Sequence, residues 1–255
     1  MISNQTKSDL KKKKKIIALL NHISSIDETV INFYGDKNDC FFLIIQDSFE
    51  RALSGKSNLC NEIYKMKGLS GRKFRVLLNE LIKNFSNPNY LEIGSWLGST
   101  ACSACFNNDL QITCIDNWSQ NFDLNTKPRE VFHSNIRKFL SKKSNFKIIE
   151  KDFREVNFKI MSGFNIYFYD GGHHYEDHFD AIKFALPSLS NKFILIVDDW
   201  NWNQVRKGTF DSIEKQNLNV ISCLEIRTTK DGSSSLITGE NSDWHQGCAF
   251  FVLKK

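Results

Sequence analysis

The feature that most constrains the fold is an alternation of short apolar runs with helical segments, which begins at residue 88. Five runs are predicted as strands: 89–94, 111–116, 146–152, 164–170 and 192–199. Between them, the segments 99–108, 128–142 and 176–188 are predicted as helices. Strands that are apolar nearly throughout and alternate with helices indicate a parallel sheet covered on both faces. The chain is therefore predicted to be an α/β protein with a doubly wound sheet.

The C-terminal part follows a different pattern. The runs 218–226 and 247–254 are predicted as strands, and no helix-length amphipathic segment separates them. They are expected to form an antiparallel pair that closes a seven-stranded sheet.

The N-terminal part is predicted to precede the sheet domain, which is assigned to residues 67–255. Residues 1–15 are predicted to be a basic disordered tail, and the run Lys11 to Lys15 equals the net charge of +5. Residues 16–66 are predicted to be a small helical extension. Helical spacing there is clearest at Phe42, Ile45, Phe49 and Leu53, and a further amphipathic helix is expected after Ser70 as its N-cap.

Composition excludes several classes of protein. No apolar run approaches the ~20 residues of a membrane helix, and none has the form of a secretory signal, so a cytoplasmic protein is expected. The seven cysteines are expected to be reduced thiols, with Cys102 and Cys105 packing a helix on the sheet. A mild positive charge without interleaved aromatic residues argues against a nucleic-acid partner.

The stretch YLEIGSWLGST, which begins at Tyr90, indicates a tight turn from a strand into a helix. Its glycines, Gly94 and Gly98, fit neither the phosphate loop nor the dinucleotide fingerprint. Glu92 would repel a pyrophosphate but could attract a cationic ligand. Asp116 ends the next strand, where a carboxylate can bind ribose hydroxyls. A cationic nucleoside such as S-adenosylmethionine fits both features, while the alternative is a purely structural turn.

Carboxylates end two consecutive strand candidates. Asp170 follows the strand 164–170, and Asp198 and Asp199 follow the strand 192–199. If these strands are neighbours, their ends lie about 4.8 Å apart, and like charges that close are costly unless a cation or a proton intervenes. Oxygen ligands suit Mg²⁺. The alternative is a capped strand end with solvated turns.

Two histidines follow Asp170 in the stretch YDGGHHYED. A turn could bring His173 or His174 back over the acidic cleft, where a neutral imidazole can accept a hydroxyl proton. A histidine beside a strand end is more often a structural residue. His178 is expected on the surface.

The residues LEIGSWLGST and CIDNW resemble motif I and the acidic second-strand end of class I S-adenosylmethionine-dependent methyltransferases. The resemblance covers roughly residues 68–255 and implies a Rossmann-like sheet of order 3-2-1-4-5-7-6 with the last strand antiparallel. It also implies positions around the cofactor. Glu92, Gly94, Trp96, Ser99 and Thr100 would lie near its methionine part, Asp116 at the ribose, Trp118 at the adenine, and Asp152 at the adenine amino group.

DGGHHYED followed by VDDW resembles, more specifically, the macrocin and mycinamicin type of macrolide-sugar O-methyltransferase. Matching positions are Asp170, Gly171, His173, Tyr175, Asp198 and Asp199. The resemblance implies that Asp170, Asp198 and Asp199 bind Mg²⁺, and that His173 or Asp170 of the turn serves as base. It implies a small-molecule or sugar hydroxyl as acceptor, with no nucleic-acid or membrane partner, and leaves a homodimer open.

Alternatives remain at this stage. Many amino-group and RNA methyltransferases end the fourth strand in N/D-P-P-Y/F, whereas this chain has Asp170-Gly171-Gly172-His173. A catalytically inactive S-adenosylmethionine-binding regulatory protein is a second alternative. The intact set Asp170, His173, Asp198 and Asp199 argues against it. Trp200, Trp202 and Trp244 are candidates for an acceptor pocket or an interface.

Overall fold

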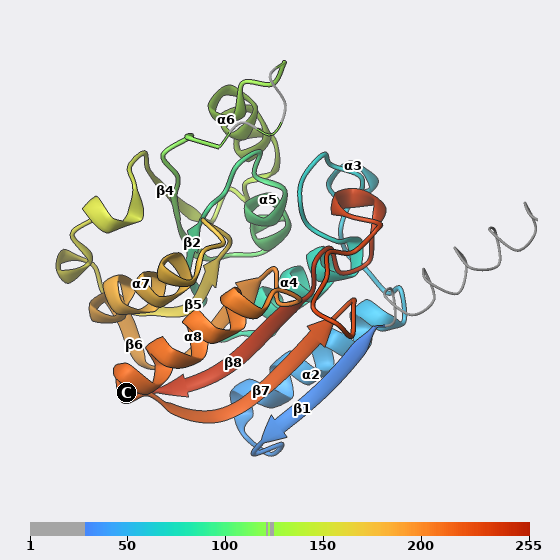
Figure 1. Ribbon diagram of the computed structural model, residues 1–255. Helices are drawn as coiled ribbons and strands as arrows, with labels where there is room; N and C mark the ends of the chain where they lie inside the picture. The colour runs from blue at the N-terminus through green and yellow to red at the C-terminus, as the bar shows by residue number, and fades with distance from the viewer. Residues whose placement is uncertain (1–28, 121, 123–124) are drawn as a thin grey trace, which may run out of the picture.

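The computed structural model describes residues 29–120, 122 and 125–255. The predicted tail 1–15 and the first part of the predicted extension, 16–28, lie outside the described residues. The described chain is built around one eight-stranded sheet (Figure 1). Within these residues no helix has the length and apolar character needed to cross a membrane.

The sheet has the order β1-β7-β8-β6-β5-β2-β3-β4. Its five strands from β6 to β4 are parallel, and β8 runs antiparallel to both β6 and β7. The predicted α/β class and the order 3-2-1-4-5-7-6 are therefore confirmed, with β8 as the antiparallel last strand. The bounds are β1 Val30–Gly35, β2 Asn89–Ile93, β3 Gln111–Ile115, β4 Asn145–Ile149, β5 Phe164–Tyr169, β6 Leu189–Asp198, β7 Asn219–Arg227 and β8 Cys248–Lys254.

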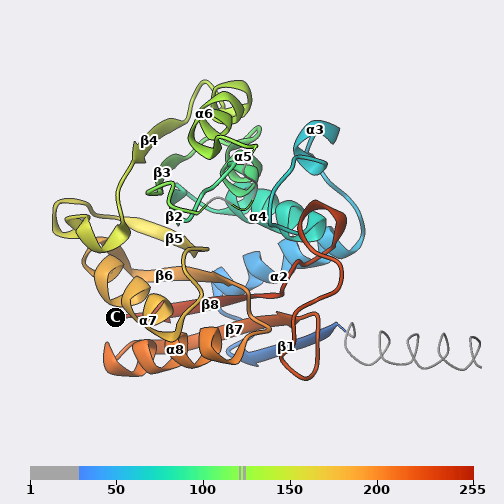
Figure 2. The same cartoon turned by 45° about the horizontal axis from the view of Figure 1, so that its top comes forward.

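Helices cover both faces of the sheet (Figure 2). One face carries α2 Cys40–Leu53, α3 Asn61–Tyr64, α4 Arg72–Asn84, α5 Ser99–Cys105 and α6 Pro128–Phe139, and the other carries α7 Tyr175–Ala185 and α8 Asn203–Lys215. Short 3₁₀ turns lie at η1 Phe153–Glu155, η2 Phe158–Ile160, η3 Leu186–Ser188 and η4 Gly239–Asn241. Because successive side chains of a strand alternate in direction, Phe168 joins the core on the first face and Tyr169 the core on the second.

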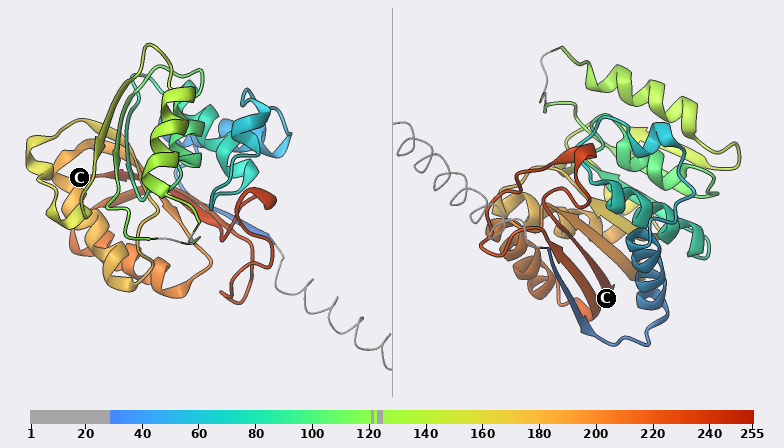
Figure 3. Two further views of the ribbon diagram at one scale, coloured as in Figure 1. Left: turned by 90° about the horizontal axis from the view of Figure 1, so that it is seen from above. Right: turned by 90° about the vertical axis from the view of Figure 1, so that its right-hand side faces the viewer.

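The N-terminal extension is not wholly helical, which corrects the prediction. Residues 30–35 form β1, which pairs antiparallel with β7 from Val30 opposite Arg227 to Gly35 opposite Ser222. The segment VINFYG is rich in β-branched and aromatic residues, and it covers what would otherwise be the free edge of β7. The ring of Phe33 lies 5.9 Å from that of Phe42 in α2. Residues 29–66 of the extension and the sheet domain thus share one core, and both lie together in Figure 3.

Helix α4 begins at Arg72, and Ser70 is not its N-cap, contrary to the prediction. The N–H of Arg72 donates to the carbonyl of Ser242 at 2.8 Å, and that of Lys73 donates to the carbonyl of Asp243 at 3.0 Å. The first N–H groups of a helix lack partners within the helix. Here the loop between β7 and β8 supplies those partners, so this loop is anchored on the start of α4.

Helix α8 was not predicted. Its buried face consists of Val205, Gly208, Thr209, Ser212 and Ile213, so small and polar residues replace most of an apolar stripe. Close packing against α7 accounts for these small residues. A Cβ added at Gly208 would lie 2.3 Å from the carbonyl oxygen of Tyr175 in α7. The two helices approach too closely for larger side chains.

The cysteines are all free thiols, as expected. Cys102 and Cys105 are completely buried in α5, within the core on the first face of the sheet. Their interpretation as helix-packing residues is confirmed.

Candidate functional site

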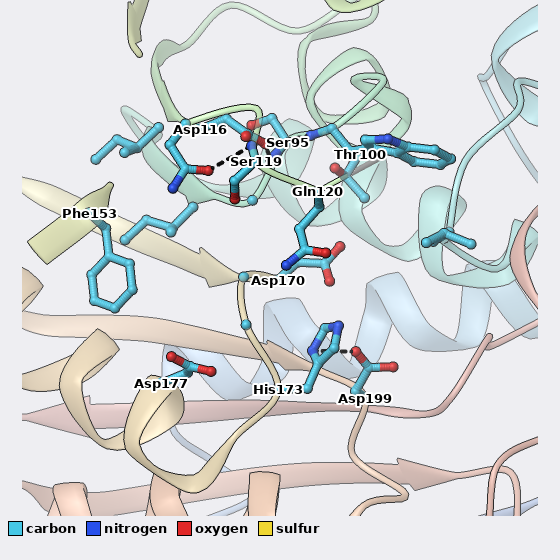
Figure 4. A pocket seen from close by; sticks show the side chains of 18 of the residues that line it. Ser95, Thr100, Asp116, Ser119, Gln120, Phe153, Asp170, His173, Asp177 and Asp199 are labelled. Carbon is cyan, nitrogen blue, oxygen red and sulfur yellow. Dashed lines mark hydrogen bonds and ion pairs between the residues drawn. The ribbon is translucent and has the colours of Figure 1, made fainter. Parts of the chain in front are cut away.

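A cavity of about 690 Å³ lies at the carboxyl ends of the central strands. This is where ligands bind in open α/β sheets, and the volume suits a small-molecule ligand. Its wall includes residues that follow four different strands: Gly94 after β2, Asp116 after β3, Asp170 after β5 and Asp199 after β6. Figure 4 shows the side chains of Asp116, Asp170 and Asp199 along this cavity.

The turn between β2 and α5 forms one wall. Gly94 has φ of 88°, and an added Cβ would lie 1.9 Å from the carbonyl oxygen of Asp170. Only glycine allows the backbones of these two strand ends to approach so closely. Trp96, Ser99 and Thr100 also line the cavity, as their predicted position near a cofactor requires.

Asp116 holds this turn through its carboxylate. Its Oδ2 accepts hydrogen bonds from the N–H groups of Ser95 and Trp96, both at 2.8 Å, and its Oδ1 accepts one from Trp118 at 2.7 Å. Two carboxylate oxygens offer about four acceptor positions. Three are used, so this conformation leaves room for about one further bond, such as one from a ribose hydroxyl, rather than two.

We expect Asp116→Ala to weaken S-adenosylhomocysteine binding by about tenfold or more, because charge-assisted hydrogen bonds contribute about 1.5–3 kcal/mol. Three N–H groups would also lose their acceptor, so the melting temperature should fall together with affinity. Calorimetry and thermal unfolding measure the two effects. Ser119→Ala is a suitable control, since Ser119 lines the same cavity without holding the turn. Unchanged affinity of Asp116→Ala for S-adenosylhomocysteine would show that Asp116 does not contact this ligand.

Two of the predicted cofactor residues are not part of the cavity wall. Glu92 is fully buried and accepts hydrogen bonds from the hydroxyls of Tyr90 at 2.6 Å and Thr100 at 3.1 Å. Burial raises the pKa of Glu92 to about 7 despite these bonds. Trp118 packs on Phe132, with ring centroids 5.3 Å apart. Both side chains support the turn from behind in this conformation.

Asp152 lies in the cavity wall, close to the ends of β3 and β4. Its Oδ1 caps the short turn η1 by accepting the N–H of Arg154 at 2.9 Å. Its predicted contact with an adenine amino group stays a prediction.

Of the three predicted metal ligands, Asp198 and Asp199 have ligand atoms within 4.8 Å of each other, in a group whose third member is His245 and not Asp170. Asp170 interacts with both carboxylates electrostatically. Burial, followed by the negative charges of Asp198 and Asp199, raises the pKa of Asp170 well above its ordinary value. Burial and the charge of Asp199 likewise raise the pKa of Asp198. Within the described residues, Asp198 Oδ2 and Asp199 Oδ1 are buried without a hydrogen-bond partner. Buried carboxylate oxygens without partners are costly, and a divalent cation is the kind of ligand that would satisfy them.

His173 is bound directly to this acidic group. Its Nδ1 lies 2.9 Å from Asp199 Oδ2, and the dashed line in Figure 4 marks this contact. Burial alone would lower the pKa of His173, but the hydrogen bond and charge of Asp199 outweigh burial and raise it. Since a carboxylate only accepts, Nδ1 carries the proton. In neutral His173 the lone pair is therefore on Nε2, the tautomer that a general base needs.

Asp177 of the stretch YDGGHHYED has a structural role. Asp177 accepts the N–H of His174 at 3.0 Å, which caps the start of α7. Its other oxygen forms an ion pair of 2.9 Å with Arg154. The stretch YDGGHHYED thus contributes Asp170 and His173 to the acidic side of the cavity and Asp177 to a helix cap.

His178 is buried, with 2% of its surface exposed, which corrects the surface position expected for it. Its ring packs edge-on against Tyr169, with centroids 4.9 Å apart. Burial lowers the pKa of His178 to about 3. The helix α7 turns this residue toward the sheet, a direction that the local sequence does not reveal.

This buried histidine should make the fold acid-sensitive. In the unfolded chain His178 has an ordinary pKa of about 6.5, so between pH 6.5 and 3 the unfolded state binds a proton that the folded state excludes. Stability therefore falls with falling pH in this window, by about 2 kcal/mol at pH 5 as an upper estimate. Denaturant unfolding at pH 7 and pH 5 measures the loss. His178→Gln, which never ionises, should reduce the loss, and an identical loss in both proteins would contradict this origin.

Several residues of the cavity were not predicted. His245 and Gln246 come from the loop between β7 and β8. His245 Nε2 lies 3.7 Å from Asp199 Oδ1. This loop carries no recognisable sequence motif. It reaches the cavity because β8 runs back antiparallel to β7, which a local sequence pattern does not reveal. Of the three candidate tryptophans only Trp202 lines the cavity, while Trp200 and Trp244 are buried.

Comparison with known protein families gives one match. Residues 91–200 match a family described as a methyltransferase domain. This range runs from β2 to the residue after Asp199 and contains both the glycine turn and the acidic group. No curated protein matches the chain.

Solved structures are similar in fold. A protein from Corynebacterium glutamicum has a TM-score of 0.52 and 12% identity, covering 81% of this chain and 96% of that one. Precorrin-6y C5,15-methyltransferase from Geobacter metallireducens has a TM-score of 0.47 and 14% identity, covering 72% and 89%. TrmN from Thermus thermophilus has a TM-score of 0.46 and 13% identity, covering 71% and 48%. This chain thus spans about half the length of TrmN, and likeness at such identities concerns the fold alone.

Proposed function

We propose that this protein, which has the Rossmann-like methyltransferase fold, uses S-adenosylmethionine to methylate a hydroxyl of a small molecule or sugar, assisted by Mg²⁺. The observation that carries the proposal is the pairing of His173 with Asp199 in the cavity that also contains the glycine turn. A base beside a group of carboxylates suits an acceptor that must lose a proton, as a hydroxyl must.

The cofactor side is supported by the turn around Gly94. Its backbone leaves space at the carboxyl end of β2, and Asp116 fixes the N–H groups of the turn. Asp152 and Phe153 line the same part of the cavity. S-adenosylmethionine, when bound, supplies a methyl group that is already electrophilic, so the protein's task is to align it with the acceptor oxygen.

The acidic group supports a cation. Asp170, Asp198 and Asp199 would hold it, since two of their buried oxygens have no partner within the described part of the chain. Hard oxygen ligands favour Mg²⁺ over softer metals. A bound Mg²⁺ supplies positive charge that lowers the pKa of an acceptor hydroxyl.

The proton is assigned to His173. Asp199 Oδ2 fixes the Nδ1–H tautomer, which leaves Nε2 to accept the hydroxyl proton. The raised pKa of His173 makes it a stronger base than an ordinary histidine. Asp170, the other base candidate, has a pKa raised by burial and by two neighbouring carboxylates, and is assigned to the cation.

The test combines binding and turnover. Titration with S-adenosylhomocysteine should give a defined affinity, and Mg²⁺ should be needed for turnover of a hydroxyl acceptor found by screening sugars, catechols and polyketides. Mass spectrometry and NMR of the product locate the new methyl group. Methylation at nitrogen or in RNA would favour the alternative class of methyltransferase. Cofactor binding without turnover of any acceptor would favour a regulatory protein.

A further inference from the structure

His245 lies beside the proposed metal site. Asp198, Asp199 and His245 offer ligand atoms that all lie within 4.8 Å of one another. Two carboxylates and an imidazole are a donor set that would suit a transition metal such as Zn²⁺ or Fe²⁺. The hydrogen bonds of His245 decide whether its ring is available for such a role.

The other ring nitrogen of His245 is already engaged. Nδ1 lies 2.9 Å from the backbone nitrogen of Gly239. A backbone N–H can only donate, so Nδ1 must accept, and in the neutral ring the proton is on Nε2. A metal ligand needs a lone pair on Nε2, which this tautomer does not have. His245 therefore presents an N–H to the cavity, whereas neutral His173 presents a lone pair.

The loop holds His245 firmly in this orientation. Its backbone N–H donates to Ser242 Oγ at 2.9 Å, and the start of α4 binds the carbonyls of Ser242 and Asp243. The preceding residue, Trp244, packs on Phe49 of α2, with ring centroids 5.7 Å apart. These contacts come from α2, α4 and the loop itself and fix the backbone at His245, while the N–H of Gly239 fixes the orientation of its ring.

The gap between His245 and Asp199 is suited to an oxygen atom. At 3.7 Å, His245 Nε2 and Asp199 Oδ1 are too far apart for a direct hydrogen bond, and Asp199 Oδ1 is otherwise without a partner within the described chain. A hydroxyl oxygen about 2.8–3.0 Å from Nε2 would accept its N–H. Trp202 and Gln246 also line the cavity.

We propose, on the basis of the function proposed above, that His245 donates a hydrogen bond to the acceptor's oxygen and is not a metal ligand. It is then a substrate-positioning residue, which leaves the proton transfer to His173. The metal site is confined to carboxylate oxygens, so the protein should prefer Mg²⁺ or Mn²⁺ to Zn²⁺.

Long-range ¹H–¹⁵N spectra of the full chain with ¹⁵N-labelled histidine test the tautomer directly. His245 should carry its proton on Nε2 both without metal and with saturating Mg²⁺, and its signal is assigned by its loss in His245→Asn. An Nδ1-protonated ring, in either condition, would overturn the proposal. The tautomer is read from the wild-type chain without an acceptor, and the variant serves only to assign the signal.

Metal titration gives an independent test. Asparagine can replace Nδ1 as the acceptor of the Gly239 N–H but has no group at the position of Nε2. The Mn²⁺ affinity of His245→Asn should stay within about twofold of the wild type, because removing a true ligand would cost about tenfold or more. A tenfold loss would make His245 a ligand. If the wild-type protein binds no Mn²⁺, the metal part of the proposed function fails, and the tautomer alone decides this inference.

Once screening has identified an acceptor, two matched variants distinguish a role of His245 in binding the acceptor from a purely structural role. His245→Asn should raise the acceptor's KM about tenfold, the value of one neutral hydrogen bond. His245→Gln, which places an amide N–H near the position of Nε2, should recover much of this loss. Equal KM values in His245→Asn and the wild type would contradict a contact with the acceptor.

Discussion

Methyl transfer by His173→Ala should be slower than in the wild type by about 10²–10⁴-fold, the contribution of a well-placed general base. The reason is the fixed tautomer: Nδ1 is bound to Asp199 at 2.9 Å, so Nε2 is the only nitrogen of the neutral ring that can take the acceptor's proton. The rate of S-adenosylhomocysteine release with a saturating acceptor measures the effect. Affinity for S-adenosylhomocysteine should change little, because His173 contacts Asp199 and makes no hydrogen bond to the glycine turn within the described chain.

His174→Asn is the matched control for this variant. His174 is the neighbouring histidine, and asparagine is a good N-cap at the start of α7. It should turn over within about twofold of the wild type if only His173 acts as base, since a surface cap change costs little in the folded state. If His174→Asn lost activity while His173→Ala retained it, His174 and not His173 would be the general base.

Asp199→Asn should lower the rate by a similar factor, about 10²–10⁴-fold, for two reasons. Asparagine no longer enforces the Nδ1–H tautomer of His173, and such a change in a carboxylate–histidine pair is severe. It also removes one charge from the proposed cation site. Asparagine is the appropriate substitution because residue 199 has φ of 54°, a conformation that asparagine adopts as readily as aspartate.

The two effects of Asp199 can be separated. Mg²⁺ affinity should fall about tenfold or more in Asp199→Asn but remain unchanged in His173→Ala, whereas both variants lose rate. In the double variant the rate losses should be far from additive, because the residues act as a unit. Asp177→Asn is the control for carboxylate removal, since Asp177 is paired with Arg154. Wild-type metal affinity in Asp199→Asn would leave Asp199 as an orienting residue only.

The central sheet could be predicted because each of its strands has a strong local signal. The strands from β2 to β6 are nearly continuous apolar runs, and their alternation with helices predicts a parallel sheet, while their order was implied by the resemblance to class I methyltransferases. The strand β1 was missed because its pairing partner, β7, lies almost two hundred residues later in the chain. The helix α8 was missed because its close contact with α7 replaces large apolar residues by Gly208 and Thr209.

The candidate site was predictable where it lies at strand ends. Asp170 and Asp199 follow strands directly, so their position at the cavity follows from the sheet alone, whereas the position of His173 depends on the turn that follows β5. Two kinds of information were absent from the local pattern. The first is the hydrogen bonding of Asp116, whose carboxylate accepts three backbone N–H groups. The second is the path of the chain between β7 and β8, which places His245 next to Asp199 although its loop carries no recognisable sequence motif.

The contact between Phe49 and Trp244 has a consequence for attempts to reduce this protein to a minimal domain. A chain cut before residue 67 would keep the glycine turn, the acidic group and His173. It would lose α2, on which the loop that carries His245 rests. If His245 positions the acceptor as proposed, such a fragment would lose control over what receives the methyl group, so acceptor choice and the N-terminal segment have to be engineered together.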